Sequence, residues 1–139
     1  MLPLLFLPIV GLSIDAGLLF DARRDLQTVA DGAARAGGME LDTQRLDRLR
    51  GGDGQVRLHP QHARDAANAY LDAVRVPGGF ARDVHIVGDG EAISVTVFRE
   101  VQPTFLRLLH VRAVQMRAAS LAQPCSGLLQ GTCPGAGGG

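Results

Sequence analysis

The sequence has few large aromatic residues and few cysteines. Its 139 residues include no tryptophan, one tyrosine and five phenylalanines, so a core has to be built mainly from alanine, valine and leucine. The two cysteines, Cys125 and Cys133, are too few for a dense disulfide framework or a four-cysteine zinc site. The length suits one domain, and a hydrophobic content of 46% is that of a folded chain rather than a disordered one.

Lysine is absent, and the chain carries no excess charge of either sign. Fourteen basic residues, all arginine, are balanced by fourteen acidic residues, which gives a formal net charge of zero. The long-range positive field that draws a protein to nucleic acid is therefore missing. We expect no nucleic-acid partner.

Residue combinations typical of catalytic or metal sites are also absent. The histidines form no H-x-x-x-H or E-x-x-H motif, and the serines have no G-x-S-x-G context. Gly88 and Gly90 belong to a turn and lack the strand and helix of a phosphate-binding loop. The sequence therefore predicts no enzymatic activity, no cofactor and no metal site. The scattered histidines are His59, His62, His85 and His110.

Residues 1–20 form a long apolar run with a single charged residue, Asp15. At about 1.5 Å per helical residue, the run approaches the ~30 Å thickness of a bilayer hydrocarbon core, so it predicts a membrane helix. A buried core helix is the alternative, and no basic residue precedes the run as in a secretory signal peptide. An ionised carboxylate is costly in lipid, so Asp15 either contacts a donor on a partner helix or is a tolerated acid near the interface.

The helical pattern continues beyond the apolar run to residue 38. Arg23 and Arg24 follow the run directly, where guanidinium groups can reach lipid phosphates. Small residues such as Gly11 and Gly17 allow helices in a membrane to approach each other closely. The second half of this helix is predicted to be amphipathic, because apolar residues recur at helical spacing. These residues are Leu26, Val29, Ala30, Ala33 and Ala34.

Residues 8–41 resemble the N-terminal segment of the TadE/TadG-like proteins of the bacterial Tad (tight adherence, Flp) pilus-assembly system. The likeness rests on an acid within the apolar run, followed by the pattern R-x-L-Q-x-x-A-D-x-A-A. The residues that carry it are Pro8, Gly11, Ile14, Asp15, Gly17, Arg23, Arg24, Leu26, Gln27, Ala30, Asp31, Ala33 and Ala34. A looser likeness, over residues 95–122, is to the family's closing module of strand, short helix and strand. The usual basic stretch before the apolar run is missing, which departs from the family pattern.

The resemblance implies a structural or assembly component of a Tad/Flp pilus in the bacterial envelope, with a minor-pilin role as its most specific form. It implies a single pass through the inner membrane with the C-terminal part in the periplasm, whereas the arginine pair alone would favour the cytoplasm. The implied partners are other Tad/Flp pilus-assembly proteins and homo- or hetero-oligomers formed through the N-terminal helix. The residues of this assembly helix are Asp15, Gly17, Arg23, Arg24, Leu26, Gln27, Ala30 and Asp31. The alternative function is a small membrane-anchored envelope module that binds a ligand or acts as a sensor.

The rest of the chain predicts a small α+β domain of pilin-like outline over residues 39–123. A short helix over residues 41–49 lies in a segment that is otherwise loop. A second helix starts at His59 and Pro60, and its apolar stripe is Ala63, Ala66, Ala67, Tyr70, Ala73 and Val74, with Leu71 at the edge. Residues that alternate around a glycine turn predict a β-hairpin, and they are Val84, Ile86, Ile93, Val95 and Val97. A two-turn helix after Pro103 and a third antiparallel strand over residues 111–121 complete the predicted three-stranded sheet.

The last segment, residues 124–139, is rich in glycine and proline and is expected to be a flexible tail. Seven residues separate Cys125 from Cys133, and we expect a disulfide between them in the periplasm. The alternative is two free thiols in a cytoplasmic tail. The chain is thus predicted to comprise a membrane and amphipathic helix over residues 1–38, the periplasmic domain over residues 39–123, and this tail.

Overall fold

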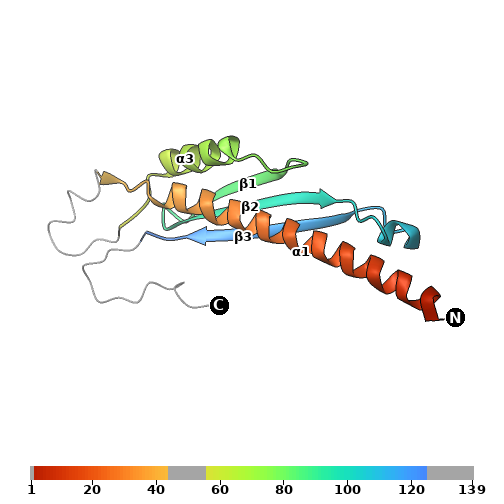
Figure 1. Cartoon of the computed structure of the whole chain (residues 1–139). Coiled ribbons are helices and arrows are strands. Elements are labelled where there is room, and N and C mark those ends of the chain that lie inside the picture. The colour runs from red at the N-terminus through yellow and green to blue at the C-terminus, as the bar shows by residue number, and fades with distance from the viewer. Residues whose placement is uncertain (1, 44–55, 125–139) are drawn as a thin grey trace, which may run out of the picture.

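The computed structural model describes residues 2–43 and 56–124, apart from the side chains of residues 2–8, 108 and 109. Within these residues the long helix α1 (Leu2–Gly38) and the shorter helix α3 (Pro60–Ala73) pack on one face of a three-stranded antiparallel sheet (Figure 1). The strands β1 (Ala81–Val87), β2 (Ala92–Val101) and β3 (Val114–Ala122) lie in the order β1-β2-β3. The 3-10 turn η2 (Leu106–Leu109) connects the last two. The predicted α+β class and antiparallel sheet are confirmed.

The sheet follows from the alternation of apolar residues along its strands. β1 and β2 pair with Ile86 opposite Ile93, so that the apolar side chains of both strands face the helices. The turn between them contains Gly88 at φ 58° and Gly90 at φ 82°, backbone conformations that favour glycine. The predicted hairpin is therefore confirmed. The third strand is also present, although it begins at Val114 rather than at residue 111.

Helix α3 begins where the sequence predicts. Pro60 occupies its first turn, and Nδ1 of the N-cap residue His59 accepts the backbone N–H of His62 at 3.4 Å. The buried residues recur at every fourth position, and they are Ala63, Ala67 and Leu71. The prediction that Leu71 lies at the edge of the apolar stripe is wrong. Its side chain is buried because this spacing aligns it with the two buried alanines.

Helix α1 supplies the largest share of small residues to the core. The five apolar residues predicted to lie on its packed face are all buried, and they are Leu26, Val29, Ala30, Ala33 and Ala34. Near its end, Gly37 lies where α1 meets α3 and β2. A Cβ atom at Gly37 would clash with the side chain of Ile93 and come within 2.7 Å of the carbonyl oxygen of Ala63. The absence of a side chain at this position therefore sets how closely the three elements pack.

The segment after Pro103 differs from its prediction. It forms the single 3-10 turn η2 instead of a two-turn helix. His110 ends this turn in the left-handed conformation, at φ 65°, and its backbone N–H donates to the carbonyl oxygen of Arg107 at 3.1 Å. A right-handed helix cannot continue through a residue in that conformation, so the turn stops there.

Two other predictions fall on parts of the chain that are only partly described. Leu41 and Leu58 form an isolated antiparallel bridge at the two ends of the intervening segment. The short helix predicted over residues 41–49 lies mostly outside the described residues. The predicted disulfide between Cys125 and Cys133 lies wholly outside them.

Candidate functional site

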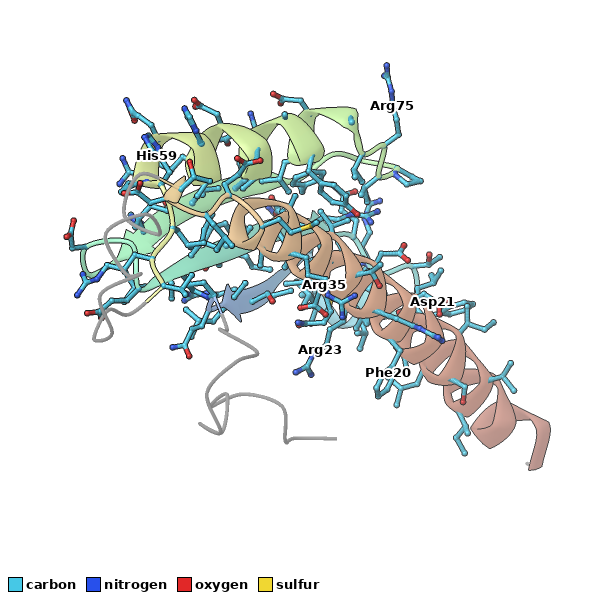
Figure 2. All side chains as sticks on the ribbon, turned by 90° about the vertical axis from the view of Figure 1, so that its left-hand side faces the viewer. Phe20, Asp21, Arg23, Arg35, His59 and Arg75 are labelled. Carbon is cyan, nitrogen blue, oxygen red and sulfur yellow. The ribbon has the colours of Figure 1, made fainter. Side chains whose placement is uncertain are left out.

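Helix α1 extends past the end of the sheet (Figure 1), and large apolar side chains on it are exposed. Its large apolar side chains there are between 47% and 74% exposed, and they are Ile9, Val10, Leu12, Ile14, Leu18 and Phe20. Phe20, Asp21 and Arg23 project from the helix into open space (Figure 2). The expectation of a membrane-spanning helix is not supported, because no helix within the described residues is both long enough and apolar enough to cross a bilayer.

Asp15, in the same part of α1, is fully buried. Its Oδ1 accepts the backbone N–H of Thr104 at 2.9 Å, and its Oδ2 accepts those of Phe105 at 2.7 Å and Leu106 at 2.6 Å. Three donors to one carboxylate satisfy a buried charge that would otherwise be strongly unfavourable. We predicted a partner helix or a lipid interface around Asp15, whereas the structure places its donors in the same chain.

Gly11 lies one helical turn before Asp15 and receives the ring of Phe105. A Cβ atom at Gly11 would lie 2.5 Å from Cδ1 and 2.7 Å from Cγ of that ring, so only glycine leaves room for it. We call Gly11, Asp15 and residues 104–106 the helix clasp. Because the helix clasp joins α1 to the loop between β2 and β3, it fixes the direction in which the apolar part of α1 leaves the sheet.

The remaining residues of the predicted assembly helix divide into two groups. Leu26 and Ala30 are fully buried in the core, and the side-chain amide of Gln27 donates to Oδ1 of Asp31 at 3.0 Å and to the carbonyl oxygen of Ala119 on β3 at 3.4 Å. These side chains therefore hold α1 on its own sheet. The other group is exposed, and it consists of Gly17, Arg23 and Arg24.

The segment that contains Asp15 and the packed face of α1 matches a known protein family. Residues 1–40 match the family described as Flp pilus-assembly TadE/G-like. The chain therefore has a TadE/G-like N-terminal segment. This confirms the resemblance seen in the sequence and points to a Tad pilus-related role in the cell envelope. No curated protein and no solved structure gives a significant match.

The pKa of Asp15 in the TadE/G-like segment is lower than that of an ordinary aspartate. Burial removes the carboxylate from water and by itself raises the pKa. The backbone N–H groups of Leu106, Thr104 and Phe105 bind the ionised form and more than offset that effect. The helix clasp is therefore built around a carboxylate that stays ionised.

This lowered pKa predicts how the stability of the protein changes with pH. An aspartate whose pKa falls on folding stabilises the native state above the unfolded value of about 3.9, and that contribution is lost as the pH falls through the folded value. The free energy of unfolding of the unchanged protein should therefore exceed that of Asp15→Asn by a constant amount from neutral pH down to about pH 5. Below about pH 4 this difference should shrink. Urea denaturation of both proteins across this range measures it. A gap that is unchanged at about pH 3 would show that folding does not favour the ionised carboxylate.

The partners of Asp15 could not be found by reading the sequence. Backbone N–H groups have no residue signature, and the three donors lie about ninety positions away along the chain. Pro103 gave the only hint, because it marks the start of a turn immediately before them. As for metals, no group of three or more histidine, cysteine, aspartate or glutamate side chains gathers in the described part of the chain.

Proposed function

We propose that this protein is a non-enzymatic assembly component of a Tad/Flp pilus, of the minor-pilin type, that acts through contacts of α1. In this proposal the apolar residues that precede Asp15 hold the chain at the inner membrane, and the sheet-bearing part lies in the periplasm. Its partners are other pilus-assembly proteins or further copies of the chain. The cysteine pair near the C-terminus, in a sequence otherwise free of cysteine, supports the periplasmic side.

One observation carries the proposal. The segment that matches the TadE/G-like family is also the helix that leaves an apolar surface uncovered past the end of the sheet. Ile9, Val10 and Leu12 lie on different sides of α1, so no single packed face accounts for them. A helix that is apolar on most sides normally lies in a protein core or in lipid. This part of α1 therefore requires lipid or other helices around it.

A complementation experiment tests the proposed function. Deletion of the gene should abolish surface pili and adherence, and the unchanged gene should restore both. A Leu12→Gln/Leu18→Gln variant should fold but restore adherence at least about tenfold less well, because two exposed leucines of α1 no longer offer apolar contact. Electron microscopy of pili and an adherence assay are the measurements. A periplasmic reporter fused after Ala122 tests the proposed side of the membrane.

The matched control removes apolar surface elsewhere. Val87 and Leu121 are exposed to a similar degree, on the face of the sheet away from the helices. Val87→Gln/Leu121→Gln should complement fully. Normal pili in the deletion strain would contradict the proposal and would favour the alternative of an envelope module that binds a ligand or acts as a sensor.

A further inference from the structure

A cavity of about 460 Å³ lies next to η2, in the connection between β2 and β3. The residues that line it are Gln102, Arg107, His110 and Arg112, all of which are exposed and two of which carry a guanidinium group. None of the described residues that line it is an aspartate or a glutamate. Cationic and hydrogen-bond-donating groups therefore converge on one space in a chain whose overall net charge is zero.

The two arginines of this cavity are not used in holding the fold together. Neither Arg107 nor Arg112 forms an ion pair with another residue in the ranges that the structure describes. Most other arginines in the described ranges likewise form no ion pair, and the exceptions are Arg57 and Arg82, which contact Asp89 and Asp72 respectively. Guanidinium groups bind phosphate oxygens in a two-pronged geometry, so an unpaired pair of them around a cavity suits a phosphate-bearing ligand.

His110 lies in this lining in a conformation that few residues other than glycine adopt. Its φ of 65° is the only positive value outside glycine among the described residues. The bond from its N–H to the carbonyl oxygen of Arg107 holds it there. This left-handed conformation ends η2, and histidine is among the non-glycine residues that adopt it more often. His110 lines the same cavity as Arg107 and Arg112.

The cavity lies at the same end of the molecule as the exposed apolar part of α1. The helix clasp binds residues 104–106 to Gly11 and Asp15 of α1, and the residues that line the cavity lie on both sides of that loop segment in the sequence. Leu12 and Ile14, in the same turn of α1, are 53% and 49% exposed. The connection between β2 and β3 lies at the end of the sheet toward which the N-terminus of α1 points (Figure 1). A cavity with two arginines in its lining and an uncovered apolar surface thus lie at one end of the molecule.

We propose that the cavity lined by Gln102, Arg107, His110 and Arg112 binds the phosphate headgroup of an anionic membrane phospholipid. The acyl chains then lie along the exposed apolar side of α1. A free phosphate would use the arginines but not the apolar surface of α1 at the same end of the molecule, which is why we assign a lipid. This inference rests on the proposed placement of α1 at the membrane.

Vesicle binding by the full-length protein tests the inference. Flotation compares vesicles of phosphatidylcholine with vesicles of phosphatidylcholine mixed with phosphatidylglycerol. Arg107→Gln/Arg112→Gln should bind the anionic vesicles roughly 30-fold more weakly than the unchanged protein, since each basic residue near an anionic leaflet contributes about fivefold. Its affinity for phosphatidylcholine alone should stay the same. Circular dichroism establishes that the variant is folded.

The matched control removes the same charge at the other end of the molecule. Arg35 and Arg64 are exposed, and Arg35 lies roughly 30 Å from Asp15 along α1 at about 1.5 Å per residue. Arg35→Gln/Arg64→Gln should bind like the unchanged protein. An equal loss in both double variants would overturn the inference, because it would show attraction by overall charge alone. His110→Asn, which tolerates the left-handed backbone, should weaken binding to a smaller extent and keeps the test open if the double variant misfolds.

A titration with soluble ligands distinguishes binding in the cavity from attachment of the protein to a membrane, and lipid binding from binding of free phosphate. Short-chain phosphatidylglycerol below its micelle concentration and inorganic phosphate are titrated separately and followed by NMR. Binding of the short-chain lipid that depends on Arg107 and Arg112 supports the inference even if no vesicle captures the protein, and in that case only the proposed membrane placement fails. Equal binding of inorganic phosphate would overturn the lipid assignment. Binding of neither ligand would overturn the inference as a whole.

Discussion

Replacement of Asp15 by asparagine is expected to lower the midpoint of thermal unfolding by at least about 5 °C. The side-chain oxygens of Asp15 accept three backbone N–H groups, and an asparagine amide offers only one accepting oxygen. Its NH₂ group would face at least one donor at the position that Oδ1 or Oδ2 now occupies. A buried donor left without an acceptor costs more than the net contribution of an ordinary hydrogen bond.

Thermal unfolding followed by circular dichroism measures this effect, and hydrogen exchange locates it. The amide protons of Thr104, Phe105 and Leu106 should exchange much faster in the variant, while those of β2 should change less. Asp21→Asn is the matched control, because Asp21 is exposed on the same helix. It should melt within about 2 °C of the unchanged protein, as most surface substitutions do. Equal midpoints for the two variants would show that the helix clasp does not stabilise the fold.

A second large effect is expected from adding one methyl group to α1 at Gly37. The new Cβ would clash with the side chain of Ile93 and approach the carbonyl oxygen of Ala63 to 2.7 Å, and a backbone atom cannot move aside cheaply. Overpacking of this kind typically costs about 1 to 3 kcal/mol. The higher helix propensity of alanine stabilises the helix by at most about 1 kcal/mol relative to glycine. Gly37→Ala should therefore destabilise the protein by about 1 to 2 kcal/mol in urea denaturation.

Gly17→Ala makes the same chemical change on the same helix without the clash. Nothing lies within 4 Å of a Cβ atom at Gly17, so only the gain in helix propensity remains. This variant should be more stable than the unchanged protein by up to about 1 kcal/mol. If both alanine variants gain stability to the same degree, the close approach of α1, α3 and β2 at Gly37 is not a constraint on the fold.

Much of the fold could be predicted because local periodicity determines it. The spacing of Leu26 and Ala30 defined the packed face of α1, and the alternation around the turn at Gly88 and Gly90 defined the hairpin. Where the prediction failed, a long-range contact or one unusual backbone angle decided the outcome. The segment after Pro103 forms a single 3-10 turn that His110 ends at a positive φ, and the N–H groups at its start are bound by Asp15. That contact joins residues about ninety positions apart, so no local pattern predicts it.

The site was harder to predict than the fold for a related reason. The sequence identifies Asp15 as a charged residue in an apolar run, but it does not show which groups bind its carboxylate. Its partners are backbone donors, and the cavity beside them is lined by residues from a loop with no motif spacing. Sequence patterns report residue types along a helix or strand, whereas these features arise from where a loop meets a helix in space.

The sequence separation across the helix clasp has a consequence for how the molecule folds. Asp15 is synthesised before its three N–H donors, which lie 89 to 91 residues later in the chain. Contacts between such distant residues close late and slow the search for the native state. During synthesis α1 is therefore complete well before the loop that binds its carboxylate. Until the loop after β2 is made, Asp15 lacks its three donors and its carboxylate stays in water.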